Sequence, residues 1–155
     1  MKKSLKLIAL SLIIAFALNL VACSTYSKVQ KALEDIGYAV VETSEQGDEV
    51  KEEAENDERV INAHILTNKD SLTGFENIYL TTVIVLEFKA TEDLVEYLKE
   101  DSVAQGFIDD VKEDGTVEEI YNELKENGFA NGNCLIIPIG LDADAVTDAI
   151  KALNA

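Results

Sequence analysis

His64 and Cys134 are the residues of this 155-residue chain best suited to nucleophilic chemistry. A serine or cysteine nucleophile needs a base, and His64 is the only histidine. It stands beside Asn62 on the polar side of an alternating strand pattern, so we predict a solvent-facing side chain. Cys134 begins an apolar strand, which favours an inert core thiol. A Cys134–His64 pair is the alternative, but nothing local supports it. We predict no catalytic residue and no enzymatic activity.

The spacing of possible metal ligands is equally sparse. A zinc site needs three or four ligands of suitable type, and one histidine and one free cysteine fall short. The run Asp110-x-Lys112-x-Asp114-Gly115 imitates the start of an EF-hand loop. It fails at Lys112, and Tyr121 stands where the bidentate glutamate belongs. We therefore predict no metal and no cofactor, with cations held only loosely by the summed charge of the surface.

The other cysteine, Cys23, lies in a different chemical setting. Three lysines in the first six residues precede an apolar stretch of 16 positions from Leu7 to Ala22. This stretch is shorter than the roughly 20 residues of a spanning helix, and small residues close it, as in a secretory signal peptide. It ends in Leu20-Val21-Ala22-Cys23, which resembles the bacterial lipobox. The resemblance implies a lipid thioether on Cys23 and cleavage between Ala22 and Cys23.

Lipid on Cys23 predicts where the protein works. Two acyl chains on one cysteine hold a protein at a bilayer without a basic patch. We expect a lipid-anchored protein on the extracytoplasmic face of the cell membrane. With Cys23 used for lipid, Cys134 has no partner for an internal disulfide.

The charge of the chain excludes one class of partner. There are 13 basic and 30 acidic side chains, and residues 1–22 contain three lysines and no acid. The remaining 133 residues therefore carry a net charge of about −20, which repels nucleic acid and attracts cations or basic partners. Solubility is the simplest reason for such a charge.

Apolar periodicity predicts one domain. After the signal peptide (1–22) and a short tether (23–27), residues 28–155 form a single domain with an acidic excursion at 42–58. That excursion could be a solvated helix or irregular. A capping box at Ser27 and Gln30 predicts the start of the first helix, and Gly37 its end. Strands are predicted at 38–41, 60–67, 78–88 and 134–139, with helices beginning near residues 91, 102, 116 and 142 or 144.

This order predicts an α+β fold. We expect a mostly antiparallel sheet of about four strands with helices packed on one face; helices on both faces are the alternative. The strand at 78–88 is apolar on both sides in its middle, so we place it at the centre of the sheet.

Loose motifs resemble a known class. Residues 33–38 (Leu-Glu-Asp-Ile-Gly-Tyr) and the strand 84–88 followed by Thr91-Glu92-Asp93 look like those of small lipoproteins of Firmicutes and related bacteria. That group has no settled activity, so the resemblance implies location and a compact domain only. Two functions stay open: a non-enzymatic surface module that binds a protein or peptide, or a small-ligand or cation-binding accessory of a transport or envelope system.

Overall fold

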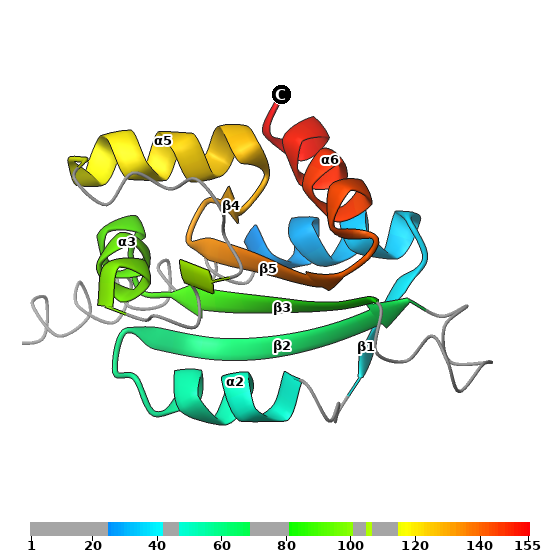
Figure 1. Cartoon of the computed structure of the whole chain (residues 1–155), viewed down its shortest axis with the longest axis horizontal. Helices are drawn as coiled ribbons and strands as arrows, with labels where there is room; N and C mark the ends of the chain where they lie inside the picture. The colour runs from blue at the N-terminus through cyan, green and yellow to red at the C-terminus, as the bar shows by residue number, and fades with distance from the viewer. Residues whose placement is uncertain (1–24, 42–46, 69–80, 101–104, 107–114) are drawn as a thin grey trace, which may run out of the picture.

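A central antiparallel sheet organises the domain (Figure 1). The computed structural model describes residues 25–41, 47–68, 81–100, 105–106 and 115–155. A helix at residues 25–35 comes first. It is followed by β1 (Tyr38–Val41), α2 (Gly47–Glu55), β2 (Val60–Asn68), β3 (Thr81–Phe88), α3 (Thr91–Glu100), α5 (Val117–Asn127), β4 (Ala130–Asn131), β5 (Cys134–Gly140) and α6 (Ala143–Asn154). The strand order is β1-β2-β3-β5-β4, with every neighbouring pair antiparallel. The predicted α+β class is confirmed.

The sheet has five strands, whereas we predicted about four; the strand that was not predicted is β4. It is two residues long and pairs with β5 through Ala130 and Asn131. A strand of two residues is too short to show any alternation of apolar and polar side chains.

Both faces of the sheet are covered by helices, so the prediction of helices on one face is wrong and its alternative holds. Alternate residues of β3 supply the two cores. Ile84, Leu86 and Phe88 pack in one cluster with residues of α2, α3 and α5. Val83 and Val85 pack in a second cluster with residues of the 25–35 helix and α6. A strand that is apolar on both sides needs cover on both, because each exposed face would leave apolar area in water.

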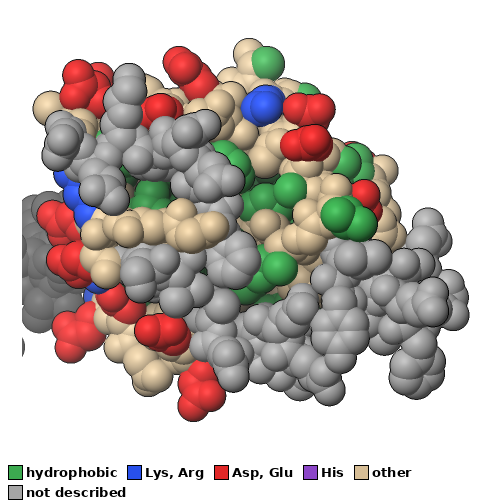
Figure 2. All heavy atoms as spheres, viewed as in Figure 1, with side chains coloured by type: hydrophobic (Ala, Val, Ile, Leu, Met, Phe, Trp, Pro, Cys, Tyr) green, Lys and Arg blue, Asp and Glu red, His purple; other side chains and the backbone are tan. Residues whose placement is uncertain are grey.

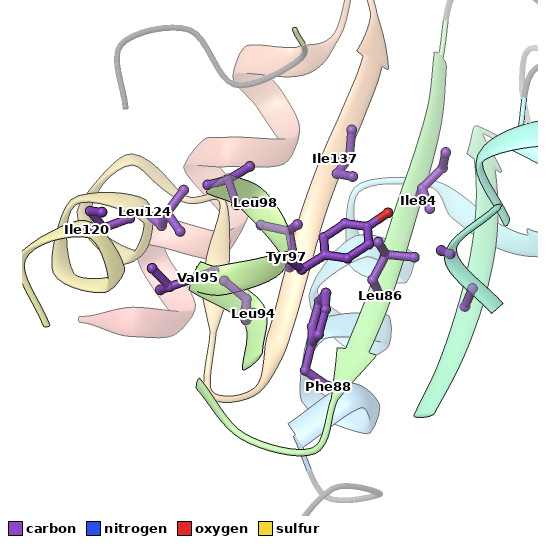
Figure 3. Packing of buried hydrophobic residues seen from close by; sticks show 14 residues of the cluster. Ile84, Leu86, Phe88, Leu94, Val95, Tyr97, Leu98, Ile120, Leu124 and Ile137 are labelled. Atoms are coloured by element: carbon purple, nitrogen blue, oxygen red, sulfur yellow. The ribbon is translucent and has the colours of Figure 1, made fainter. Parts of the chain in front are cut away.

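The larger cluster is built around α3. Figure 3 shows Ile120 and Leu124 of α5 on one side of this helix and Ile84, Leu86 and Ile137 of the sheet on the other. The rings of Phe88 and Tyr97 are in tilted contact with centroids 5.2 Å apart. Helix α3 therefore joins α5 to the sheet rather than lying at the edge of the core.

Local sequence signals place most helix ends. The Thr116 capping box is present, with the Thr116 side chain accepting from the Glu119 backbone and the Glu119 side chain accepting from the Thr116 backbone. Helix α5 ends at Gly128 with φ +81°. The predicted cap at Ser27 is wrong, because Ser27 lies inside the 25–35 helix. Gly37, with φ +98°, follows that helix as predicted.

The acidic stretch contains a helix. Of the two alternatives for 42–58, residues Gly47–Glu55 form α2. Ala54 is fully buried in the cluster with α3, while Glu52, Glu53 and Glu55 are exposed. The small side chain of Ala54 lets a highly charged helix lie against the sheet with its carboxylates in water.

Several predictions fall on residues outside the described part of the chain. They include the signal peptide, the cleavage site Ala22–Cys23, the strand start at 78–80, most of the helix predicted from Ser102, and Asp110, Lys112 and Asp114 of the EF-hand-like run. Among the described helices, none is long and apolar enough to span a membrane.

Candidate functional site

A polar cluster lies within the sheet face that packs against the 25–35 helix. Glu87 of β3 is only 3% exposed, although it carries a carboxylate. Its Oε2 accepts a hydrogen bond from Asn62 Nδ2 at 3.0 Å and lies 3.0 Å from His64 Nε2. Asn62 and Glu87 are register partners, and His64 lies opposite Val85, so β2 and β3 place all three groups on one face. Because a buried carboxylate requires donors, Asn62 and His64 make this position tolerable for Glu87.

Tyr26 of the 25–35 helix covers this cluster. Its ring stacks on the His64 ring, with centroids 3.6 Å apart and an interplanar angle of 12°. The Tyr26 hydroxyl is buried and has no hydrogen-bond partner in the described part of the chain. Burial, followed by the negative charge of Glu87, raises the pKa of Tyr26 to about 12. The Tyr26 side chain is therefore neutral at physiological pH, and its ring packs the 25–35 helix against His64.

Cys134 belongs to the same face but is not poised to react. It is fully buried and stands opposite Glu87 in the β3–β5 register. Burial and then the Glu87 charge raise the pKa of the Cys134 thiol far above its ordinary value. Since the thiolate is the nucleophilic form, this setting disfavours thiol chemistry. The pairing of Cys134 with His64 does not form: β3 lies between their strands, and His64 Nε2 points to Glu87.

The prediction for His64 needs correction. We expected a solvent-facing side chain, but it is only 24% exposed, held between Glu87 and Tyr26. A β-strand pattern identifies the side of the strand on which a residue lies and says nothing of what covers that side. The 25–35 helix covers His64 in part, while Asn62 on the same side of β2 stays exposed.

Two members of the cluster, Tyr26 and Glu87, were missed by sequence reasoning. The signal for Glu87 was present: it is the only charged residue in the predicted strand 78–88. A lone acid in a strand that is otherwise buried needs a partner, and the one histidine lies in the preceding strand. Tyr26 gave no such signal, because it precedes the predicted cap and was assigned to the tether.

What the cluster can do chemically is limited. His64 Nε2 is engaged with Glu87, and the His64 ring is stacked against the Tyr26 ring. In the same described residues, no group of three His, Cys, Asp or Glu side chains could hold a metal ion. The arrangement joins a helix to a sheet, and it does not pair Cys134 with His64 as nucleophile and base.

A hollow of about 300 Å³ lies elsewhere, at the C-terminal ends of α5 and α6. Its lining consists of Asn122, Lys125, Glu126, Lys151, Asn154 and Ala155. Asn154 donates to the carbonyl oxygens of Lys125 and Ala130, so part of this lining holds the end of α5 in place. Two lysines beside a single glutamate do not form the oxygen cage that a calcium ion requires.

The surface is strongly acidic. Figure 2 shows carboxylates spread around the rim of one face, with few basic side chains among them. Arg59 is held by Asp57 at 2.7 Å and by Glu100 at 2.9 Å, with its guanidinium 5.7 Å from the centre of the Tyr97 ring. This arginine is committed to internal contacts, so it offers little to an external anion.

Comparisons with known proteins identify no relative: family models, curated proteins and solved structures were searched, and none matches the chain.

Proposed function

We propose that this protein is a lipid-anchored extracytoplasmic module that binds a protein partner and catalyses no reaction. The observation that carries the proposal is the internal use of its chemically capable residues. Glu87 is bonded to Asn62 and His64, His64 is stacked under Tyr26, and the Cys134 thiol is buried. Side chains that hold the 25–35 helix against the sheet are not available to bind or activate a substrate.

The position of that helix supports the anchored part of the proposal. Lipid attachment is proposed at Cys23, and the described helix begins at residue 25. Two residues span at most about 7 Å, so the anchor acts almost directly on the helix. Val29 and Leu33 of this helix are fully buried in the second core cluster. Strong packing at this point suits a domain that is attached to a membrane by its first element.

Three measurements test the proposal. Cells that carry the full chain are compared with cells that carry Cys23→Ser, by detergent phase partitioning and by protease treatment of intact cells. We expect only the unmodified chain to partition with detergent and to be cut from outside. A short cross-linker on intact cells should then join it to discrete partner proteins. Equal partitioning of Cys23→Ser would refute the anchor, and the absence of any cross-linked species would refute partner binding.

A further inference from the structure

Strand β1 lies at one edge of the sheet. It is the last strand of the sheet and pairs with β2 alone, through Tyr38–Val41 against Ile65–Asn68. No strand pairs with its outer side in the part of the chain that the structure describes. The main-chain donors and acceptors along such an edge are a template for another strand. In Figure 1, β1 lies at the periphery of the sheet, away from α3 and α5.

The side chains of β1 include none of the residue types that usually prevent an edge strand from pairing with another strand. Tyr38 is buried in the second core cluster, but Val40, two residues later on the same face, is 47% exposed. Ile36, just before the strand, is 36% exposed. Edge strands that are protected against pairing commonly carry lysine, proline or inward charges, and the β1 sequence Tyr-Ala-Val-Val carries none. An added strand would cover Val40 and complete the ladder.

The residues that flank β1 in the sequence are mostly acidic, and this bears on the charge that an added strand should carry. Residues 34–58 contain eleven acidic side chains and one basic side chain, Lys51. Glu34 and Asp35 are exposed immediately before β1, and Lys51 is partly engaged by Glu55 at 3.7 Å. Lys31 and Lys28 of the 25–35 helix lie about one and two turns before Asp35, respectively. A segment rich in lysine or arginine is the complementary occupant, and an acidic segment is repelled.

We infer that β1 accepts an extended, Lys/Arg-rich segment of the partner protein as a sixth strand of the sheet. The inference rests on the proposed function and names the chemistry of its partner. Main-chain hydrogen bonds to β1 supply the affinity, and the covered Val40 favours an apolar residue at one position of the segment. The acidic residues that flank β1 in the sequence favour basic residues at others. No pocket or rearrangement of the core is needed.

A peptide of defined charge tests the inference. The protein is purified from membranes in a nonionic detergent and mixed with a fluorescein-labelled peptide of alternating lysine and valine. An equal peptide of alternating glutamate and valine is the control. We expect the lysine peptide alone to bind, with its affinity falling as salt rises, and the amide signals of residues 38–41 to shift in NMR spectra.

Three variants separate edge pairing from general attraction. Val40→Lys should weaken binding about tenfold or more, because a positive charge then stands on the docking edge. Val40→Glu, equally polar at the same position, should bind within about threefold of the unmodified protein or more tightly. Ala152→Lys adds the same charge at an exposed position of α6 and should change binding by less than about threefold.

Other results would overturn the inference. Equal weakening by Val40→Lys and Ala152→Lys would show that only net charge acts, and shifts confined to other elements would place the peptide elsewhere. Absence of peptide binding would also overturn it. If cross-linking on cells still finds discrete partners in that case, the proposed function stands and the docking site is wrong.

Discussion

The Tyr26 ring lies almost parallel to the His64 ring, 3.6 Å from it between centroids, while the Tyr26 hydroxyl is buried without a hydrogen-bond partner in the described part of the chain. The contact joins a residue three positions after the proposed lipid site to the second strand of the sheet. The stacking of the two rings stabilises this contact, whereas the burial of the Tyr26 hydroxyl without a partner destabilises it.

Tyr26→Phe separates these two effects. It keeps the stack and removes the unsatisfied hydroxyl, so the free energy of unfolding should stay the same or rise by up to about 1 kcal/mol. Tyr26→Ala, which loses the ring, should lower it by about 2–3 kcal/mol. Urea denaturation followed by circular dichroism measures both. A loss of more than about 1 kcal/mol for Tyr26→Phe would mean that the hydroxyl has a partner after all.

His64→Ala tests the donor to Glu87. The change leaves a nearly buried carboxylate with Asn62 as its remaining side-chain donor, and we expect a loss of about 2–4 kcal/mol in the free energy of unfolding. In the His64→Ala/Glu87→Gln double variant, the loss should be smaller than the sum of the two single losses, because the uncompensated charge is gone. Strict additivity in urea denaturation would show that the two side chains do not interact.

The reactivity of Cys134 follows from its burial. The side chain is fully buried and its thiol pKa is raised, first by burial and then by Glu87. For the lipidated protein, in which the proposed thioether removes the thiol of Cys23, we expect no reaction with Ellman's reagent in the folded state at pH 8 and one reactive thiol per chain in denaturant. Cys134→Ser, which lacks this thiol, is the negative control. Rapid labelling of the folded protein would contradict the structure around β5.

The Asp57–Arg59 pair predicts a dependence of stability on acid. Hydrogen bonds from Arg59 hold the pKa of Asp57 below its ordinary value of 3.8. A carboxylate whose pKa is lowered by folding contributes stability at neutral pH and loses it as pH falls through its folded-state pKa. Asp57→Asn should therefore lower Tm at pH 7, and the difference from the unmodified protein should shrink below about pH 4. A difference in Tm that stays constant from pH 7 to pH 3 would exclude this contribution.

Gly128 and Gly37 form a matched pair. Both have positive φ, +81° and +98°, so alanine at either position is strained by about 1–2 kcal/mol. At Gly37, the nearest atom to an added Cβ is the Asn68 side chain at 3.5 Å, an ordinary contact. At Gly128, the added Cβ would collide with the main chain of Thr147 in α6. Gly128→Ala should therefore lower the urea midpoint clearly more than Gly37→Ala. Equal midpoints would contradict the close approach of α5 and α6.

Sequence patterns predicted those features that depend on short stretches of chain. The capping box at Thr116, the turn at Gly37 and the apolar strand before Lys89 each follow from neighbouring residues, and each is present. The cover on both faces was left as an alternative, since periodicity identifies apolar faces but not the helix that meets each one. The apolarity of β3 on both sides was the available sign.

The candidate site was less predictable for a related reason. Glu87 and His64 lie 23 residues apart, and their contact depends on the register of β2 against β3. That register includes an irregularity between Val60 and Asn62, which shifts the pairing by one residue. A sequence pattern does not locate such a bulge, so the composition of the two strands suggests a partner for Glu87 but the register that brings it to His64 cannot be predicted.

The four residues of β1 have a consequence for binding strength. A ladder of that length offers few main-chain hydrogen bonds, so a free peptide should be held weakly and released quickly. A partner attached to the same membrane does not arrive as a free peptide, because both molecules are confined to one thin layer. Such confinement raises effective concentration without any new contact. A short edge that releases soluble peptides readily can therefore still be occupied by a membrane-bound neighbour, and occupancy would follow the density of both proteins in the membrane rather than their concentration in solution.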